Sequence, residues 1–399
     1  MDAGTLGERV RSVRRRRGLT QRELAAAAGL SESLIKKVEQ GTITGVRLET
    51  LHKIAVALRV PTSGLFPGPD AAPAEDVDVT AWEAVRRALE GRCPDDAAQD
   101  GEPTLNGVKA AFGLLVPLLI GSQFGRVRVL LPALLRDADV LVSVSANGAE
   151  ADARGLRSQV RQLAGYMMGQ TWQLGVAGEA MDLALDDASG DIMTTMAAVD
   201  WKCWSLLRQG QLDACRELAT RWADRSEPRI SRATPDELAA WGRFLTLVST
   251  AAARDNRPGE AKSALKLAKA AATAIGRDIV PQFNPWQVFG PATVSWYQAE
   301  NAIVQDRPDV TLGIAARVTG RGFPVPRNLL RHRLDVASAH ASVRQYAESV
   351  AVLSEVNEAA PEWLAHQRFA RDILSGVIER RRTLTPEMRQ LADAVRLPL

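Results

Sequence analysis

Cysteine and aromatic residues are scarce in this sequence, which has three cysteines in 399 residues and only 5% aromatic side chains. So few cysteines exclude the disulfide framework of a small secreted domain. Cys203 and Cys215 could face each other across a helix hairpin as a redox pair, although packing as small apolar side chains is commoner for such cysteines. The composition, with 46% hydrophobic and 24% charged residues, is otherwise that of an ordinary soluble intracellular protein.

Long hydrophobic runs are also missing. The most apolar stretch, from Ala110 to Ile120, contains Gly113 and Pro117 and is too short to cross a bilayer. The first residues lack the basic and then apolar pattern of a secretion signal. The sequence therefore predicts a cytoplasmic protein with no membrane partner.

Signatures of catalysis and of metal binding are absent as well. His52, His332, His340 and His366 have no metal-ligand spacing with the cysteines, and no nucleophile motif accompanies them. Neither a phosphate-binding loop nor a dinucleotide fingerprint occurs. We expect no enzyme activity, no metal ion and no cofactor.

Charge is distributed unevenly, although the net charge is only +3. Residues 5–66 hold 12 Lys or Arg against 5 Asp or Glu, a balance that suits a polyanionic partner. Residues 67–105 hold 3 against 10. The stretch PGPDAAPAEDVD in this acidic segment has turn formers and few large apolar residues, so we expect a flexible linker there. A short helix from about Thr80 to Glu90, with Thr80 as its N-cap, would follow.

Helical periodicity dominates the remainder, and strand signals are almost absent. The sequence predicts an all-α protein in three parts. They are a basic domain at 1–66, an acidic linker with a short helix at 67–105, and a domain of helical repeats at 106–399.

The long C-terminal part has the pattern of stacked helix pairs, because helical segments alternate with short breaks at Gly, Pro, Asp or Asn. Four breaks align on a small or β-branched residue of the second helix. They are RQGQLDAC ending at Cys215, RDNRPGEA ending at Ala261, QDRPDV ending at Val310 and VRQYAES ending at Ser349. This recurrence resembles a degenerate tetratricopeptide repeat (TPR), which implies an α-solenoid with an extended concave surface.

The first sixty residues carry the most specific motif. Four short helices are expected, at about 6–17, 21–28, 32–40 and 48–58. Thr20 and Ser31 would cap the second and third, with Gly29 at the turn between them. From Arg14 to Gly41 the chain reads R-x3-G-L-T-Q-x2-L-A-x3-G-L-S-x3-I-x2-V-E-x-G. This motif resembles the Cro/repressor (XRE) helix-turn-helix family, which implies a lambda-repressor-like fold and binding to double-stranded DNA.

The resemblance implies roles for individual residues, because in that family the third helix lies in the major groove. By position, DNA contacts are implied for Gln21, Arg22, Glu32, Ser33, Lys36, Lys37 and Arg47. Glu32, Ser33 and Lys37 would reach base edges, with Lys36 beside them. Gln21 would contact a phosphate, and Arg47 would lie near the backbone and the minor groove. Arg14 and Glu39 match an ion pair that ties the first helix to the third, which is a structural role.

Two of these features have a plainer alternative. The basic run from Arg14 to Arg17 could be only a solvated helix face. Glu32 could stabilise the dipole of its helix without touching DNA, because a carboxylate is favoured at any helix start.

The repeat domain is the expected input side of the protein. The combination resembles the peptide-sensing quorum regulators of Gram-positive bacteria and the actinobacterial regulators that join this helix-turn-helix to TPRs. FGPATV at 289–294 and HRLDVASAHA at 332–341 look closer to the actinobacterial group. Because one small domain reads few base pairs, specific operators usually need two copies, and we expect a homodimer held by the repeats.

Aromatic residues gather in one loop, VPQFNPWQVFGP, from Val280 to Pro291. Phe283, Trp286 and Phe289 could line a ligand groove, or they could cap one helix against the next. Trp201 and Trp204, three residues apart, are more often core residues than a ligand platform.

Two functions stay open at this level. In the first, a peptide or small molecule in the repeat groove biases the separation of two DNA-binding heads and so controls transcription. In the second, the protein is a constitutive DNA-tethered adaptor whose repeats dock another protein. An enzyme with an accessory helix-turn-helix is a distant third, because the catalytic motif is missing.

Overall fold

The computed structural model describes residues 5–43, 46, 48–65, 80–92, 102–145, 149–188, 190–318, 327–381 and 383–399. These residues are mainly helical, and their one recorded extended pairing is an isolated bridge between Ile279 and Phe289. The expected all-α class is confirmed. No helix in the described ranges is both long enough and apolar enough to span a membrane. Arg47 and most of the acidic segment lie outside these ranges.

The first four helices form a compact unit, which we call the head. It comprises α1 (Leu6–Arg16), α2 (Gln21–Ala28), α3 (Glu32–Glu39), α4 (Leu48–Leu58) and a closing 3-10 turn, η1 (Ser63–Leu65). Thr5 and Thr20 each begin a helix with a complete capping box, in which the threonine and the glutamate three residues on satisfy each other's backbone N–H groups. Gly29 ends α2 at a φ of 62°, a left-handed conformation that would strain a side chain. The local sequence therefore sets the angle between α2 and α3.

The segment after the head begins differently from the expectation. Thr80–Trp82 is a 3-10 turn (η3), and the α-helix α5 (Glu83–Leu89) has Trp82 rather than Thr80 at its N-cap position. The N-cap prediction is therefore wrong, because the chain first makes a tighter turn that buries Trp82 in the core of the repeats. Since α5 packs on α7 and α8, it belongs to the helical array and not to a linker.

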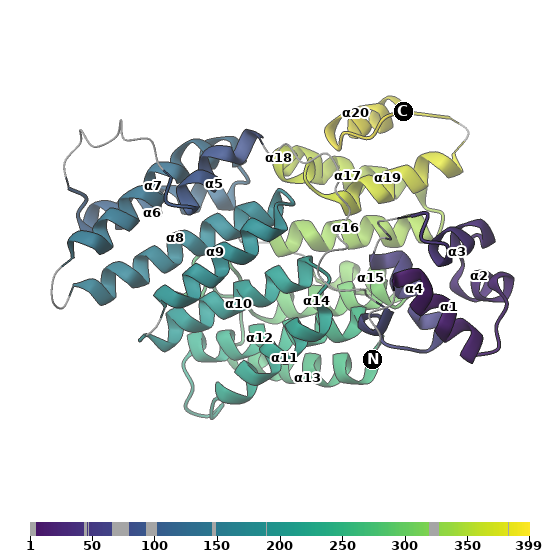
Figure 1. Cartoon of the computed structure of the whole chain (residues 1–399), viewed down its shortest axis with the longest axis horizontal. Coiled ribbons are helices and arrows are strands. Elements are labelled where there is room, and N and C mark those ends of the chain that lie inside the picture. The colour runs from purple at the N-terminus through teal and green to yellow at the C-terminus, as the bar shows by residue number, and fades with distance from the viewer. Residues whose placement is uncertain are drawn as a thin grey trace.

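The rest of the described chain is a helical array (Figure 1). Its helices are α6 (Leu105–Ile120), α7 (Phe124–Val144), α8 (Glu150–Gln170), α9 (Leu174–Asp187), α10 (Ile192–Arg208), α11 (Leu212–Arg225), α12 (Pro235–Arg254), α13 (Pro258–Ile275), α14 (Pro291–Val304), α15 (Pro308–Arg317), α16 (Arg327–Ser342), α17 (Tyr346–Ala359), α18 (Pro361–Leu364), α19 (Arg368–Arg380) and α20 (Pro386–Ala394). From α6 to α17, consecutive helices pack in pairs across short turns. This is the TPR-like arrangement that the sequence predicts.

The same turn joins each pair. A residue in the left-handed conformation ends the first helix, and the next residue donates its N–H to the carbonyl five positions back. The left-handed residues are Ser122, Trp172, Gly210, Asn256, Asp306 and Arg344. Five positions after each of them lies a fully buried residue that packs against the first helix: Val127, Ala177, Cys215, Ala261, Thr311 and Ser349. The repeat register is thus common to all six pairs.

One position of the sequence alignment is corrected by this register. The equivalent of Cys215 in the fifth pair is Thr311 and not Val310, which is only half-buried. Thr311 donates its hydroxyl to the carbonyl of Ala299 at 3.0 Å, so its polar group is satisfied inside the array. The alignment favoured Val310 because a β-branched apolar residue is the usual occupant of a buried position.

The array coils back on itself, so that its last helices meet its first ones. Glu362 of α18 accepts a hydrogen bond from the backbone N–H of Gly125 at 2.6 Å. Trp172 donates its indole N–H to the carbonyl of His366 at 2.9 Å. In Figure 1, α18 accordingly lies next to α7 near the middle of the view, and the head lies at the right-hand end. The last helices therefore close part of the concave side.

Candidate nucleic-acid interface and internal cavity

Helix α3 presents a polar face to solvent. Ser31 caps it by accepting a hydrogen bond from the N–H of Leu34 at 3.2 Å, and Ile35 and Val38 anchor its inner face in the head core. The outer face carries Glu32, Ser33, Lys36 and Lys37, and all four are exposed. Four of the seven residues to which the sequence assigns DNA contacts are therefore brought together on one accessible helix face.

A buried ion pair supports that face from behind. Arg14 of α1 holds Glu39 at the end of α3 through two hydrogen bonds, Nε to Oε1 at 2.5 Å and Nη2 to Oε2 at 2.8 Å. Burial favours the neutral form of Glu39, but the hydrogen bonds from Arg14 and Gln21 outweigh it and hold the pKa of this carboxyl below its usual value. Glu39 therefore stays ionised and fixes α1 against α3.

Gln21 has a second role that the sequence did not indicate. Its amide nitrogen donates to Oε2 of Glu39 at 2.9 Å, so the start of α2 is tied into the same ion pair. One N–H of that amide remains for a phosphate, in keeping with the sequence-based assignment. Arg22, the next residue, is exposed on α2. Arg47 lies outside the described residues.

The head docks on the array through α4 and not through α3. His52 of α4 lies with Nδ1 2.7 Å from the carbonyl oxygen of Arg254, at the end of α12. Thr62 donates its hydroxyl to the same oxygen at 2.8 Å. Because a carbonyl can only accept, Nδ1 of His52 carries the proton in this arrangement.

The turn between α12 and α13 completes this docking contact. The backbone N–H of Ser63 donates to Oδ1 of Asp255 at 2.7 Å, and Asn256 donates its side-chain N–H to the carbonyl of Val60 at 3.3 Å. Asn256 is the left-handed residue of that repeat turn. The turn between α12 and α13 thus both joins a helix pair and binds the head. The outer face of α3 stays accessible.

A large cavity of about 1380 Å³ lies between the head and the concave side of the array. The head contributes the end of α2 and one side of α4, including Glu49, His52 and Lys53. The array contributes residues of α8, α10, α12, α14, α16 and α19. Any molecule that fills this cavity therefore touches both the head and the repeats.

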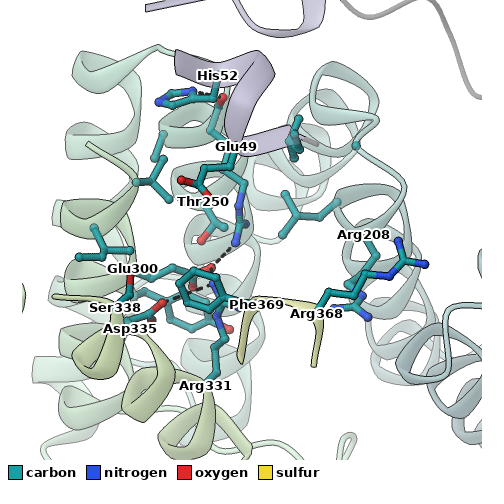
Figure 2. A pocket seen from close by; sticks show the side chains of 18 of the residues that line it. Glu49, His52, Arg208, Thr250, Glu300, Arg331, Asp335, Ser338, Arg368 and Phe369 are labelled. Atoms are coloured by element: carbon teal, nitrogen blue, oxygen red, sulfur yellow. Dashed lines mark hydrogen bonds and ion pairs between the residues drawn. The ribbon is translucent and has the colours of Figure 1, made fainter. Parts of the chain in front are cut away.

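Charged side chains line much of the cavity, and most are paired (Figure 2). Arg254 is ion-paired with Glu300, and Arg331 lies 3.3 Å from Oδ1 of Asp335. Burial, together with the nearby charge of Glu300, raises the pKa of Asp335 to about 7. The sequence signal for Asp335 was a single carboxylate inside the apolar pattern of HRLDVASAHA.

The aromatic side chains of the loop at 280–291 lie partly in the core and partly in the cavity wall. Trp286 lines the cavity, as one of the two sequence interpretations proposed. Phe283 and Phe289 do not, and their assignment to a ligand groove is corrected: both belong to the core beneath the loop. Phe289 packs so closely on Gly242 of α12 that a Cβ there would lie 2.1 Å from its ring. These two rings therefore hold the loop on the array.

The two tryptophans of α10, Cys203 of α10 and Cys215 of α11 lie mostly inside the array. Trp201 is fully buried in the core, whereas Trp204 reaches the cavity. Cys203 and Cys215 are both buried, free and close to each other, and burial raises the pKa of the Cys203 thiol well above its usual value. A thiol in this state is a packing residue and a poor nucleophile.

Comparison with known proteins identifies the head. Residues 5–64 match the family model described as a helix-turn-helix domain. The chain thus joins a helix-turn-helix DNA-binding domain at its N-terminus to an array of TPR-like helical repeats. No curated protein matches the sequence.

Two solved structures overlap the chain loosely. One is a crystal structure of Bacillus thuringiensis PlcR in complex with the peptide PapR7 and DNA, at 10% identity, covering 87% of this chain and 98% of that one, with a TM-score of 0.36. The other is the TPR domain of P58(IPK), at 14% identity, covering 73% of this chain and 98% of that one, with a TM-score of 0.18. Superpositions this loose add nothing to the architecture described above.

Proposed function

We propose that this protein is a sequence-specific, DNA-binding transcriptional regulator whose repeat domain senses a small molecule or peptide. The observation that carries the DNA-binding part is the exposed row of polar and basic side chains on α3 of the helix-turn-helix domain. Lys36 and Lys37 can donate to guanine, Glu32 can accept from cytosine, and Ser33 fits either. The excess of basic residues in the head supplies the attraction for phosphates.

The sensing part rests on the position of the cavity. A ligand shifts a conformational equilibrium only if it binds one arrangement more tightly than the other. A ligand between head and array meets this condition, because its contacts with Glu49 or Lys53 exist only while the head is docked. Occupancy of the cavity therefore changes the population of the docked head.

The partial closure of the concave side by the head and the last helices favours this proposal over a constitutive adaptor. A partner protein that docks along the inner surface of the repeats would have to displace both the head and α18–α19. A small molecule or short peptide needs no such opening. We further propose that the protein is a cytoplasmic homodimer. One small head reads few base pairs, whereas two heads related by a two-fold axis can read a two-fold symmetric site.

The test is selection of binding sites from a random duplex library at physiological salt with the full-length chain. We expect enrichment of a two-fold symmetric site, and a matched variant with Lys36→Ala and Lys37→Ala should lose that enrichment. A variant with Lys262→Ala and Lys266→Ala, two exposed lysines of α13 outside the cavity, is the control that should keep it. Absence of any enriched sequence from the wild-type protein, with or without added cell extract, would overturn the proposal. Sedimentation of the protein with the selected duplex then gives the number of heads bound.

A further inference from the structure

The arginines of the cavity wall differ in whether a carboxylate lies within ion-pair distance of them. Figure 2 shows Glu300 and Asp335 on one side, where they face arginine partners, and Arg208 and Arg368 on the other. Within the described ranges, no carboxylate lies within ion-pair distance of Arg208. Arg208 therefore contributes a positive charge to this side of the cavity that no neighbouring carboxylate neutralises.

Arg208, the last residue of α10, is held by aromatic rings instead of by a carboxylate. Its guanidinium lies 4.3 Å from the centroid of the Trp172 ring and 5.6 Å from that of Trp204. It donates one hydrogen bond, from Nη2 to the carbonyl of Gly169 at 3.1 Å, while its Nε is buried without a partner. Burial and the neighbouring charges of Arg331 and Arg368 lower the pKa of Arg208 to about 10, so the side chain stays charged at neutral pH.

Trp172 is an unusual residue for its position. It is the left-handed residue of the turn between α8 and α9, with a φ of 65°, a conformation that a bulky side chain rarely adopts. The turn places its ring under Arg208 and under Arg368, whose guanidinium lies 3.7 Å from the ring centroid. The same backbone conformation occurs at the other five repeat turns, so what distinguishes this turn is the aromatic ring of Trp172. That ring brings two guanidinium groups together at one end of the cavity.

The surrounding wall offers apolar surface. Trp204, whose ring centroid lies 5.6 Å from the Arg208 guanidinium, lines the cavity together with Trp286 and the aliphatic side chain of Leu207. The apolar body of a ligand would leave water and pack against these side chains, which is favourable.

We propose that the cavity binds a small organic anion, whose carboxylate or phosphate group accepts hydrogen bonds from Arg208 and whose apolar body packs against Trp204 and Trp286. A guanidinium presents two parallel N–H groups that match the spacing of such oxygens, and the match is strongest away from bulk water. Such an anion would be the ligand of the sensing function proposed above. Only the effect of the anion on DNA binding rests on that proposed function.

The test follows the tryptophan fluorescence of the full-length protein during titration with three matched probes. Benzoate and phenyl phosphate carry the two candidate head groups on one ring, and benzamide is the neutral counterpart of benzoate. We expect saturable changes with at least one anion and none with benzamide. The anion that binds more tightly identifies the head group.

Two variants and a control make the test specific for Arg208. Arg208→Met keeps an unbranched side chain but removes the charge and the donors, and should weaken anion binding about tenfold or more. Arg208→Lys keeps the charge and should bind with an intermediate affinity. Arg216→Met is the control, because Arg216 is ion-paired with Asp213 and lies outside the cavity. Equal binding of benzamide, unchanged affinity in Arg208→Met, or no saturable anion binding overturns the inference.

Measurements of DNA affinity separate this inference from the sensing function. Anion binding that depends on Arg208 but leaves DNA affinity unchanged upholds the anion site and contradicts ligand control of the head. A response of DNA affinity to cell extract that persists in Arg208→Met contradicts the anion site and upholds ligand control.

Discussion

His52 of the DNA-binding head lies 2.7 Å from the carbonyl oxygen of Arg254, 202 residues further along the chain. Arg254 in turn pairs through its side chain with Glu300 in the cavity wall. One residue of the array therefore contacts the head with its backbone and the cavity with its side chain.

The docking of the head should weaken at acidic pH. Burial lowers the pKa of His52, and the charge of Arg254 also disfavours the imidazolium, while two backbone carbonyls and Asp255 act in the other direction. A released head would have an ordinary histidine pKa of about 6.5. As the pH falls through this value, the released form takes up a proton that the docked form resists, so release becomes easier. Above about pH 7.5 the docking contact should not change.

Hydrogen exchange measures this effect, because the amide of Ser63 donates to Asp255 only in the docked head. We expect faster exchange of this amide at pH 5.5 than at pH 7.5, after correction for intrinsic rates. His52→Asn places a non-titrating amide donor where Nδ1 lies and should remove the pH dependence. Equal pH dependence in the wild type and in His52→Asn would show that another group is responsible.

Much of the head could be predicted from sequence, since its signals are local. Thr20, Ser31 and Gly29 define the ends of α2 and α3 by capping and by backbone conformation alone. The cavity could not be predicted in this way. Its walls depend on contacts such as Trp172 with His366, which lie 194 residues apart and leave no periodic pattern.

The repeats fall between these two cases. Junctions with Gly210, Asn256 and Asp306 follow the usual preference for left-handed turns, and the sequence alignment found them. Ser122 and Trp172 occupy the same position in the first two pairs against that preference, and the alignment missed both. Arg208 lay inside an aligned junction, but its sequence context does not reveal that it lacks a carboxylate partner in the folded protein.

The ion pair between Arg14 and Glu39 should be essential for the stability of the head. Removal of one partner leaves a buried charge, which typically costs about 3–5 kcal/mol. We expect Arg14→Met to raise exchange rates throughout α1 and α3 in native-state hydrogen exchange. Lys53→Ala breaks an exposed pair with Glu49 and should change stability by at most about 0.5 kcal/mol. Similar exchange in the two variants would contradict a stabilising role for the buried pair.

Gly242→Ala should destabilise the array, because the added Cβ would lie 2.1 Å from the ring of Phe289. Overpacking of this kind costs about 1–3 kcal/mol. Gly259→Ala, in the neighbouring helix α13, meets no atom within 4 Å and should be neutral or slightly stabilising. Thermal melting of the two variants by circular dichroism gives the comparison. If Gly242→Ala melts no lower than Gly259→Ala, Phe289 is not packed as described.

Lys37→Ala and Gln21→Ala should have different effects on DNA recognition. The amino group of Lys37 is exposed on the outer face of α3, so its loss should relax the preference at one base pair by about 1–3 kcal/mol. Gln21 faces the backbone in the implied complex and also holds Glu39, so its loss should weaken all duplexes about equally. Binding of each variant to a panel of single-base operator variants separates the two patterns. An unchanged preferred sequence in Lys37→Ala would mean that α3 does not lie in the major groove with this face toward the bases.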